Sequence, residues 1–162
     1  MGPDASAEQR ALNLVDRCIE PAKLKQIAQN ARNAGADDVE RAALLKLYSV
    51  MPAAKLGTLE HDVWQSVYAL EGALKQERGK TTLLARTRQK LQRDGELKTV
   101  SDLVLGKESA GFQMLIDRNM PELTFEAVAL RHALRFDGPI LNAARARLEN
   151  VSDKTGEGTG QL

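Results

Sequence analysis

The residues from Thr58 to Gly95 read TLEHDVWQSVYALEGALKQERGKTTLLARTRQKLQRDG, and they hold the only tryptophan of the chain and its clearest helical pattern. In the first half of this stretch, apolar residues recur at steps of four, three and four, which is the spacing of one face of an α-helix. These residues are Val63, Val67, Leu70 and Leu74. The spacing predicts a long amphipathic helix whose aliphatic side packs on the rest of the chain.

The start of this helix is marked by its capping residues. Thr58 can accept a hydrogen bond from an amide of the first turn, and Glu60 and Asp62 place negative charge at the positive end of the helix dipole. The end has two alternatives. Gly79 either ends the helix or lies inside a helix that continues over 59–94, at a cost of about 1 kcal/mol relative to alanine. In either case Gly95 closes the helical segment, which we assign to 59–94.

The rest of the chain repeats the helical pattern in shorter segments. Three helices are expected within 6–51 and several short ones within 99–151, with glycine, proline or capping residues at their ends. No segment shows the alternation that predicts a half-buried strand. We therefore expect an all-α protein, a single compact bundle of about seven to eight helices. A flexible N-terminus, 1–5, would precede it, and a short disordered tail, 152–162, would follow.

Composition limits the class of protein. Of the 162 residues, 43% are hydrophobic but only 4% are aromatic, so the chain can build a core that is mainly aliphatic. The formal net charge is +1, which means that an electrostatic function must come from local clusters. A single cysteine excludes an internal disulfide, and no apolar run approaches the roughly 20 residues of a membrane span. The N-terminal residues also lack the apolar segment of a secretory signal. We expect a cytoplasmic protein that does not bind membranes.

Two short patterns point weakly to catalysis. The tetrapeptide RGKT, 78–81, matches the end of a phosphate-binding loop, but position 74 is leucine where that loop needs glycine, and a helix is expected where the loop needs a strand. Glu96 and Lys98 have the spacing of part of a metal-dependent nuclease site, which normally needs strands to hold its carboxylates. We therefore expect no catalytic residues and no enzymatic activity.

Metal binding is not expected either. His61 and His132 are the only histidines, and Cys18 has no partner at a metal-ligand spacing. His61 lies between two acidic residues in the first turn of the long helix, and we expect it at the surface. We expect His132 to be a half-buried core histidine. The sequence indicates no metal and no cofactor.

Positive charge in the second half of the central stretch suggests nucleic-acid binding. Arg86, Lys90 and Arg93 recur at steps of four and three on one side of an expected helix. Segments 100–105 and 110–118, joined by a short glycine-containing turn, could form a helix–turn–helix. An ordinary helical pair with a solvated basic face explains the same pattern. The residues expected to contact DNA or RNA are Arg86, Arg88, Lys90, Arg93, Lys98, Lys107, Ser109, Gln113 and Arg118.

Protein binding is suggested by Trp64 and Tyr68. Both lie one residue on from the aliphatic face of the long helix, so the core cannot bury them wholly. Exposed aromatic side chains beside aliphatic ones favour a partner helix or a homodimer. The alternative is that the tryptophan simply completes an aliphatic core. Because catalytic patterns are missing, we predict a non-enzymatic helical interaction module that binds a protein partner or self-associates. DNA or RNA binding is the alternative.

Overall fold

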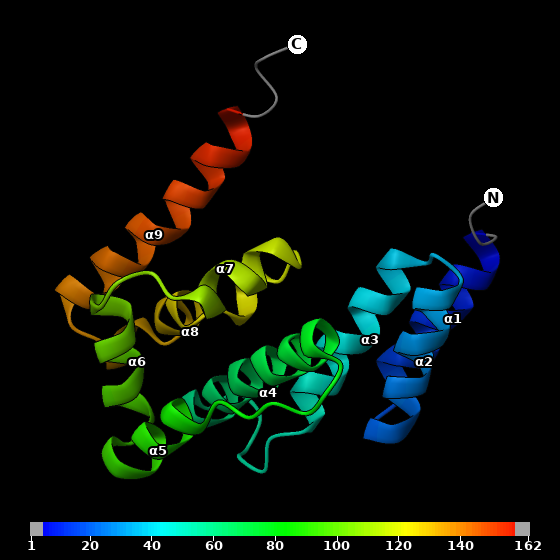
Figure 1. The fold of residues 1–162 in the computed structure, drawn as a ribbon, viewed down its shortest axis with the longest axis horizontal. Coiled ribbons are helices and arrows are strands. Elements are labelled where there is room, and N and C mark those ends of the chain that lie inside the picture. The colour runs from blue at the N-terminus through cyan, green and yellow to red at the C-terminus, as the bar shows by residue number, and fades with distance from the viewer. Residues whose placement is uncertain (1–4, 158–162) are drawn as a thin grey trace. The chain divides into compact units, whose positions relative to one another are not determined.

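The computed structural model describes the backbone of residues 5–157 and the side chains of residues 5–151. This part of the chain holds nine α-helices, two short 3-10 helices and no strand (Figure 1), which confirms the all-α prediction with slightly more helices than expected. The helices pack as two compact units, Met1–Leu56 (unit 1) and Gly57–Leu162 (unit 2), where the sequence suggested a single bundle. Pro52 follows the last helix of unit 1 and prevents that helix from continuing toward unit 2.

Unit 1 is a three-helix unit made of α1 (Ala5–Arg17), α2 (Pro21–Asn33) and α3 (Asp37–Val50). α2 packs along α3, and α1 contacts both. Small side chains dominate the contact and allow the helices to approach closely. The buried cluster consists of Ala31, Ala36 and Val39, with Ala11, Leu12 and Ile27 packed against it.

Unit 2 is built around α4 (Leu59–Arg78). Thr58 caps this helix, because its hydroxyl accepts a hydrogen bond from the amide of His61 at 3.1 Å. Val63 and Val67 are completely buried and Leu70 is nearly so, which confirms the predicted core face. The later helices of the unit are α5 (Ala85–Asp94), α6 (Glu96–Leu105), α7 (Ala110–Asp117), α8 (Phe125–Arg131) and α9 (Gly138–Glu157), with the 3-10 helices η1 (Pro121–Leu123) and η2 (Ala133–Arg135).

The core of unit 2 is aliphatic, as the composition predicts. α6, α7 and α8 pack directly on α4, α5 packs chiefly on α6, and α9 packs on α6 and α8. The buried cluster consists of Leu59, Val63, Val67, Leu91, Val100, Val104, Val128, Ala129, Phe136, Ile140 and Ala144. α9 continues past Val151 to Glu157, beyond the expected start of the tail. The rest of that tail, 158–162, and most of the expected flexible N-terminus, 1–4, lie outside the described residues.

Of the two alternatives for the central segment 59–94, the structure shows the one in which Gly79 ends the helix, and no single helix spans the segment. α4 ends at Arg78, and Gly79 adopts a left-handed conformation with φ +70° while its amide bonds the carbonyl of Lys75 at 2.8 Å. Glycine favours this conformation because it has no Cβ to clash with the backbone. The chain then runs without helix over 80–84 before α5 begins. This turn places α5 on a different path from α4.

The expected helix–turn–helix also differs in its packing. α6 starts at Glu96, directly after Gly95, and is longer than the helix predicted over 100–105. α6 packs chiefly on α5, α8 and α9, whereas α7 packs on α4 and η1. Within the described residues, α6 and α7 therefore bury their apolar sides against other helices and not mainly against each other.

Candidate functional site

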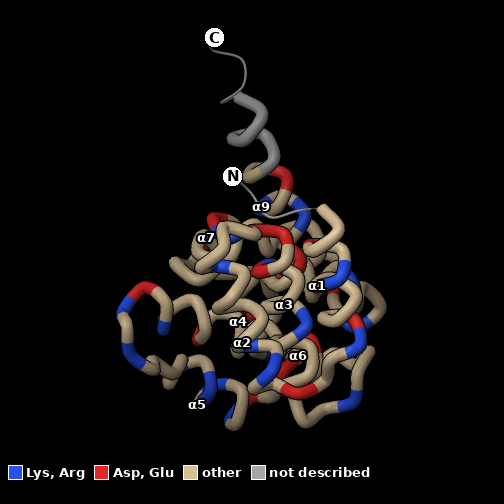
Figure 2. Tube along the Cα trace, turned by 90° about the vertical axis from the view of Figure 1, so that its right-hand side faces the viewer, with Lys and Arg blue, Asp and Glu red and all other residues tan. Residues whose placement is uncertain are grey.

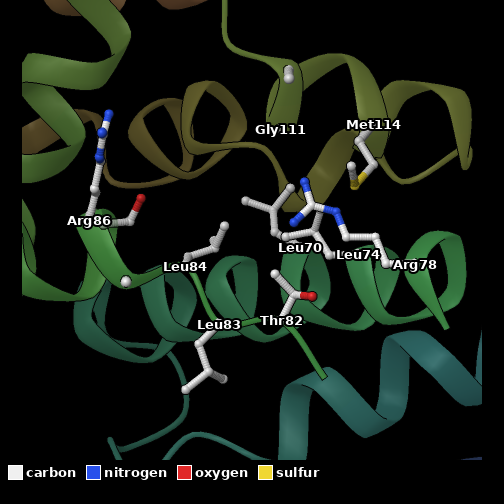
Figure 3. Close-up of a pocket in the computed structure, with 12 residues that line it drawn as sticks. Leu70, Leu74, Arg78, Thr82, Leu83, Leu84, Arg86, Gly111 and Met114 are labelled. Carbon is white, nitrogen blue, oxygen red and sulfur yellow. The ribbon is translucent and has the colours of Figure 1, made fainter. Parts of the chain in front are cut away.

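A groove lies in unit 2 between α4, the segment 82–87 and α7 (Figure 3), and its cavity has a volume of about 690 Å³. Its apolar lining comes mainly from leucines of α4, from the leucines that precede α5 and from Met114 of α7. Leu74, Leu84 and Met114 are only half-buried. The groove therefore presents aliphatic surface to solvent at a place where three segments meet.

α7 forms one wall because two features hold it close to α4. Gly111 permits the close approach, since a Cβ at this position would lie 3.2 Å from Cδ2 of Leu70. Arg118, the residue that ends α7, donates hydrogen bonds to Oε1 of Gln76 at 2.7 Å and to the carbonyl of Ala73 at 3.3 Å. These contacts fix both ends of α7 on α4.

The opposite wall, the segment before α5, is held by Glu71. Its carboxylate accepts hydrogen bonds from the amide of Leu84 at 2.9 Å and from Nε and Nη2 of Arg88, both at 2.7 Å. Glu71 is buried, and its hydrogen bonds to Arg88 raise the pKa of that guanidinium despite partial burial. The carboxylate thus bonds both the residue that precedes α5 and Arg88 within that helix, and it ties the start of α5 to α4.

Trp64 and Tyr68, the predicted partner-binding residues, are half-buried on the side of α4 that faces α5. The guanidinium carbon of Arg88 lies 5.3 Å from the centroid of the tryptophan ring and 5.8 Å from that of the tyrosine ring, which is cation–π geometry. The indole Nε1 donates to Oε1 of Glu96 at 3.3 Å, and Trp64 packs against the core cluster. These contacts engage both aromatic rings within the chain, so the prediction that they bind a partner gains no support from their position.

The basic stripe predicted to contact nucleic acid is largely paired with carboxylates. Lys90 Nζ donates to Asp94 Oδ2 at 2.9 Å and to Asp102 Oδ2 at 2.8 Å. Arg93 also bonds Asp94, and Lys98 also bonds Asp102. Hydrogen bonds from Arg93 and Lys90 lower the pKa of Asp94 to about 2. Acidic and basic residues are interspersed along much of the described trace (Figure 2).

The other predicted nucleic-acid residues belong to α5, to the turn after α6, and to α7 and its two ends. Ser109 caps α7, Gln113 bonds within that helix, and Arg118 bonds α4. Lys107 and Arg86 are exposed and have no ion-pair partner within the part of the chain that the structure describes. Of all the predicted residues, only Arg86 lines the groove.

The groove has a basic rim that the sequence analysis did not predict. Arg78 and Arg86 are among its lining residues, and no aspartate or glutamate is. Figure 3 shows the side chain of Arg78 lying across the groove between α4 and Met114, with Arg86 on the other side of the leucines. Both arginines are exposed. The site was missed because its walls come from residues about 40 positions apart, which no local pattern joins.

A second polar cluster joins α4 to α8. His61, expected at the surface, is instead only 2% exposed, because α8 packs on the first turns of α4. The carboxylate of Asp62 is hydrogen-bonded to both histidines: Oδ2 lies 2.7 Å from Nε2 of His132, and Oδ1 lies 3.2 Å from Nδ1 of His61. Burial alone would raise the pKa of Asp62, but these hydrogen bonds and the charge of Arg131 hold it below its ordinary value. His132 is half-buried as expected, and the cluster works as a link between helices.

The described residues were also searched for a metal site and for membrane-spanning helices, and the chain was compared with known proteins. The described residues contain no group of three or more side chains that could hold a metal ion. None of their helices combines the length and apolar character needed to cross a bilayer. Comparisons with protein-family models, with curated proteins and with solved structures found no match for this chain. The function must therefore be inferred from the chemistry of the groove itself.

Proposed function

We propose that this chain is a non-enzymatic interaction module and that the groove of unit 2 binds an apolar segment of a partner protein. The observation that supports this most is the convergence of Leu74, Leu84 and Met114 on one hollow while each stays half-buried. Apolar surface held in contact with water is unfavourable, and a partner segment that covers it recovers that free energy.

An open groove suits a peptide segment better than a small molecule. Small-molecule sites bury about 70–90% of the ligand and need enclosing walls. Here Leu83 is 57% exposed at the rim, and Arg78 and Arg86 also lie at the surface. Grooves between helices commonly receive an amphipathic helix that inserts side chains spaced three, four and seven residues apart.

The alternative prediction, DNA or RNA binding, has less support. Binding to phosphates requires lysine or arginine side chains that can replace the counterions condensed on the nucleic acid. Arg88, Lys90, Arg93 and Lys98 are each hydrogen-bonded to a carboxylate of the chain. A titration of duplex DNA at low salt tests this alternative directly, and binding that weakens steeply as salt rises would favour it over the proposed function.

A matched pair of substitutions on α7 tests the groove. Met114→Gln places an amide in the groove, and Ile116→Gln places the same amide on the same helix, at a half-buried position that does not line it. Amphipathic helical peptides are selected from a phage library against the wild-type protein, and their affinities for each variant are measured by fluorescence anisotropy. We expect Met114→Gln to weaken binding about tenfold, since an apolar contact is replaced by a desolvated amide. Ile116→Gln should stay within about twofold of wild type.

Two further measurements make the result decisive. Circular dichroism and thermal unfolding establish that both variants are folded. Sedimentation of the wild-type protein identifies a second copy as the partner if a dimer forms that Met114→Gln dissociates. Selection of no peptide in a protein that stays monomeric, or equal weakening by both substitutions, would show that the groove is not the binding site.

A further inference from the structure

All charged residues that line the groove have the same sign. Arg78 and Arg86 line it, and no carboxylate does. Two other cations of α5 are neutralised, Arg88 by Glu71 and Lys90 by two aspartates. In contrast, neither groove arginine has an ion-pair partner within the described residues. The groove is thus a place where the chain leaves positive charge uncompensated beside apolar surface.

The two arginines lie on either side of the apolar lining of the groove. Arg78 is the last residue of α4 and Arg86 is the second residue of α5, so the two cations come from different helices. Figure 3 shows the leucines of α4 and Leu84 between them. A segment that inserts apolar side chains here must therefore pass two guanidinium groups. Guanidinium is weakly hydrated, tolerates apolar neighbours and binds carboxylate through two parallel hydrogen bonds.

We infer that the groove selects an acidic amphipathic segment of another protein, one whose apolar side chains enter between α4 and α7 and whose flanking carboxylates pair with Arg78 and Arg86. This inference rests on the proposed function and adds the chemistry of the partner. A segment with flanking lysines is disfavoured, because its cations would face two arginines with no intervening acid. The two arginines therefore discriminate between partner segments whose apolar side chains fit the groove equally well but whose flanking charges differ.

The first test is the composition of the peptides selected by the wild-type protein. We expect aspartate and glutamate to be enriched beside the apolar positions and lysine and arginine to be depleted. The tightest peptide is then synthesised in three forms, with glutamate, glutamine or lysine at the flanking positions. We expect the glutamate form to bind about fivefold more tightly than the glutamine form, and the lysine form to bind about fivefold more weakly. Raising the salt concentration should narrow these differences.

Charge reversal assigns the preference to particular residues. In the double variant Arg78→Glu, Arg86→Glu, we expect the order of the peptides to invert, so that the lysine form binds most tightly. Arg135→Glu is the matched control, because Arg135 is exposed, lies in η2 and does not line the groove. It makes the same change in charge as either groove substitution alone and should leave the wild-type order intact.

The outcomes separate this inference from the proposed function. If the three peptides bind equally well and binding still depends on Met114, the groove is a binding site and the acidic partner is wrong. If the glutamate form still binds most tightly after both arginines are reversed, its carboxylates do not pair with Arg78 and Arg86, and the inference is overturned. If no peptide is selected and the protein stays monomeric, or if the fatty-acid anion dodecanoate binds the groove while peptides do not, both proposals are wrong.

Discussion

Replacing Glu71 by alanine is expected to lower the free energy of unfolding of unit 2 by about 3 kcal/mol. The carboxylate is 8% exposed and accepts hydrogen bonds from the Leu84 amide and from two nitrogens of Arg88. Removing one partner of a buried ion pair costs about 3–5 kcal/mol, because the other charge is left unpaired. The side chain of Arg88 keeps 31% of its exposure, so water can replace part of the lost interaction. We therefore use the lower end of that range.

The measurement is urea-induced unfolding followed by tryptophan fluorescence. Trp64 is the only tryptophan, and the Arg88 guanidinium lies 5.3 Å from its ring, so its emission reports on this contact. Arg88→Met and the double variant Glu71→Ala, Arg88→Met complete a thermodynamic cycle. We expect the double variant to cost less than the sum of the single changes by at least about 1 kcal/mol, because the two residues act as one unit.

Glu77→Ala is the matched control for Glu71→Ala. Glu77 lies on the same helix, and its contact with Arg118 at 3.5 Å is largely exposed, so its loss should change stability by less than about 0.5 kcal/mol. The reasoning would be refuted if Glu71→Ala also stayed within about 0.5 kcal/mol of wild type, or if the cycle were additive. Either result would mean that the carboxylate does not hold α5 on α4.

Two further predictions concern the turn after α4 and the paired basic stripe. Gly79→Ala should destabilise the protein by about 1 kcal/mol in the same urea assay, because alanine is strained at φ +70°. The exposed neighbour Lys80 supplies the control, since Lys80→Ala should change the stability by less than about 0.5 kcal/mol. Equal effects of the two substitutions would contradict the role of the left-handed turn. The carboxyl pKa of Asp94 should be about 2, set by hydrogen bonds from Arg93 and Lys90. Since this folded value is below the ordinary 3.8, the stabilisation is complete above pH 3.8 and is lost as the pH falls toward 2. Carboxyl-carbon NMR titration checks this, and an Asp94 pKa that does not rise in the Lys90→Gln variant would show that the ion pair is absent in solution.

The helices of this protein are determined largely by local sequence. Thr58, Ser109 and Thr124 each cap the helix that follows by accepting a bond from an amide three residues later. Such a cap depends only on residues next to one another in the chain, and so does the 3.6-residue spacing that buries Val63 and Val67. These features were therefore predictable without knowledge of how the helices pack.

The candidate site was predictable only in part. The sequence pointed to Arg86 as a surface cation, and the structure places it at the groove. It did not indicate that Arg88, two residues later, pairs with Glu71, or that Lys90 pairs with Asp102. A run of basic residues looks alike whether its charges are free or neutralised. The difference depends on which carboxylates another helix brings within about 3–4 Å.

The amino-acid sequence alone specified that the chain is helical, where α4 begins and which of its sides is buried, because hydrogen bonds and apolar periodicity within one helix involve only near neighbours. Only the tertiary structure determined which charged side chains form ion pairs and where the groove lies. Leu74 and Met114 lie on one cavity although 40 positions separate them. Burial, pairing and the shape of a cavity depend on distances between helices, and those distances exist only once the chain has packed.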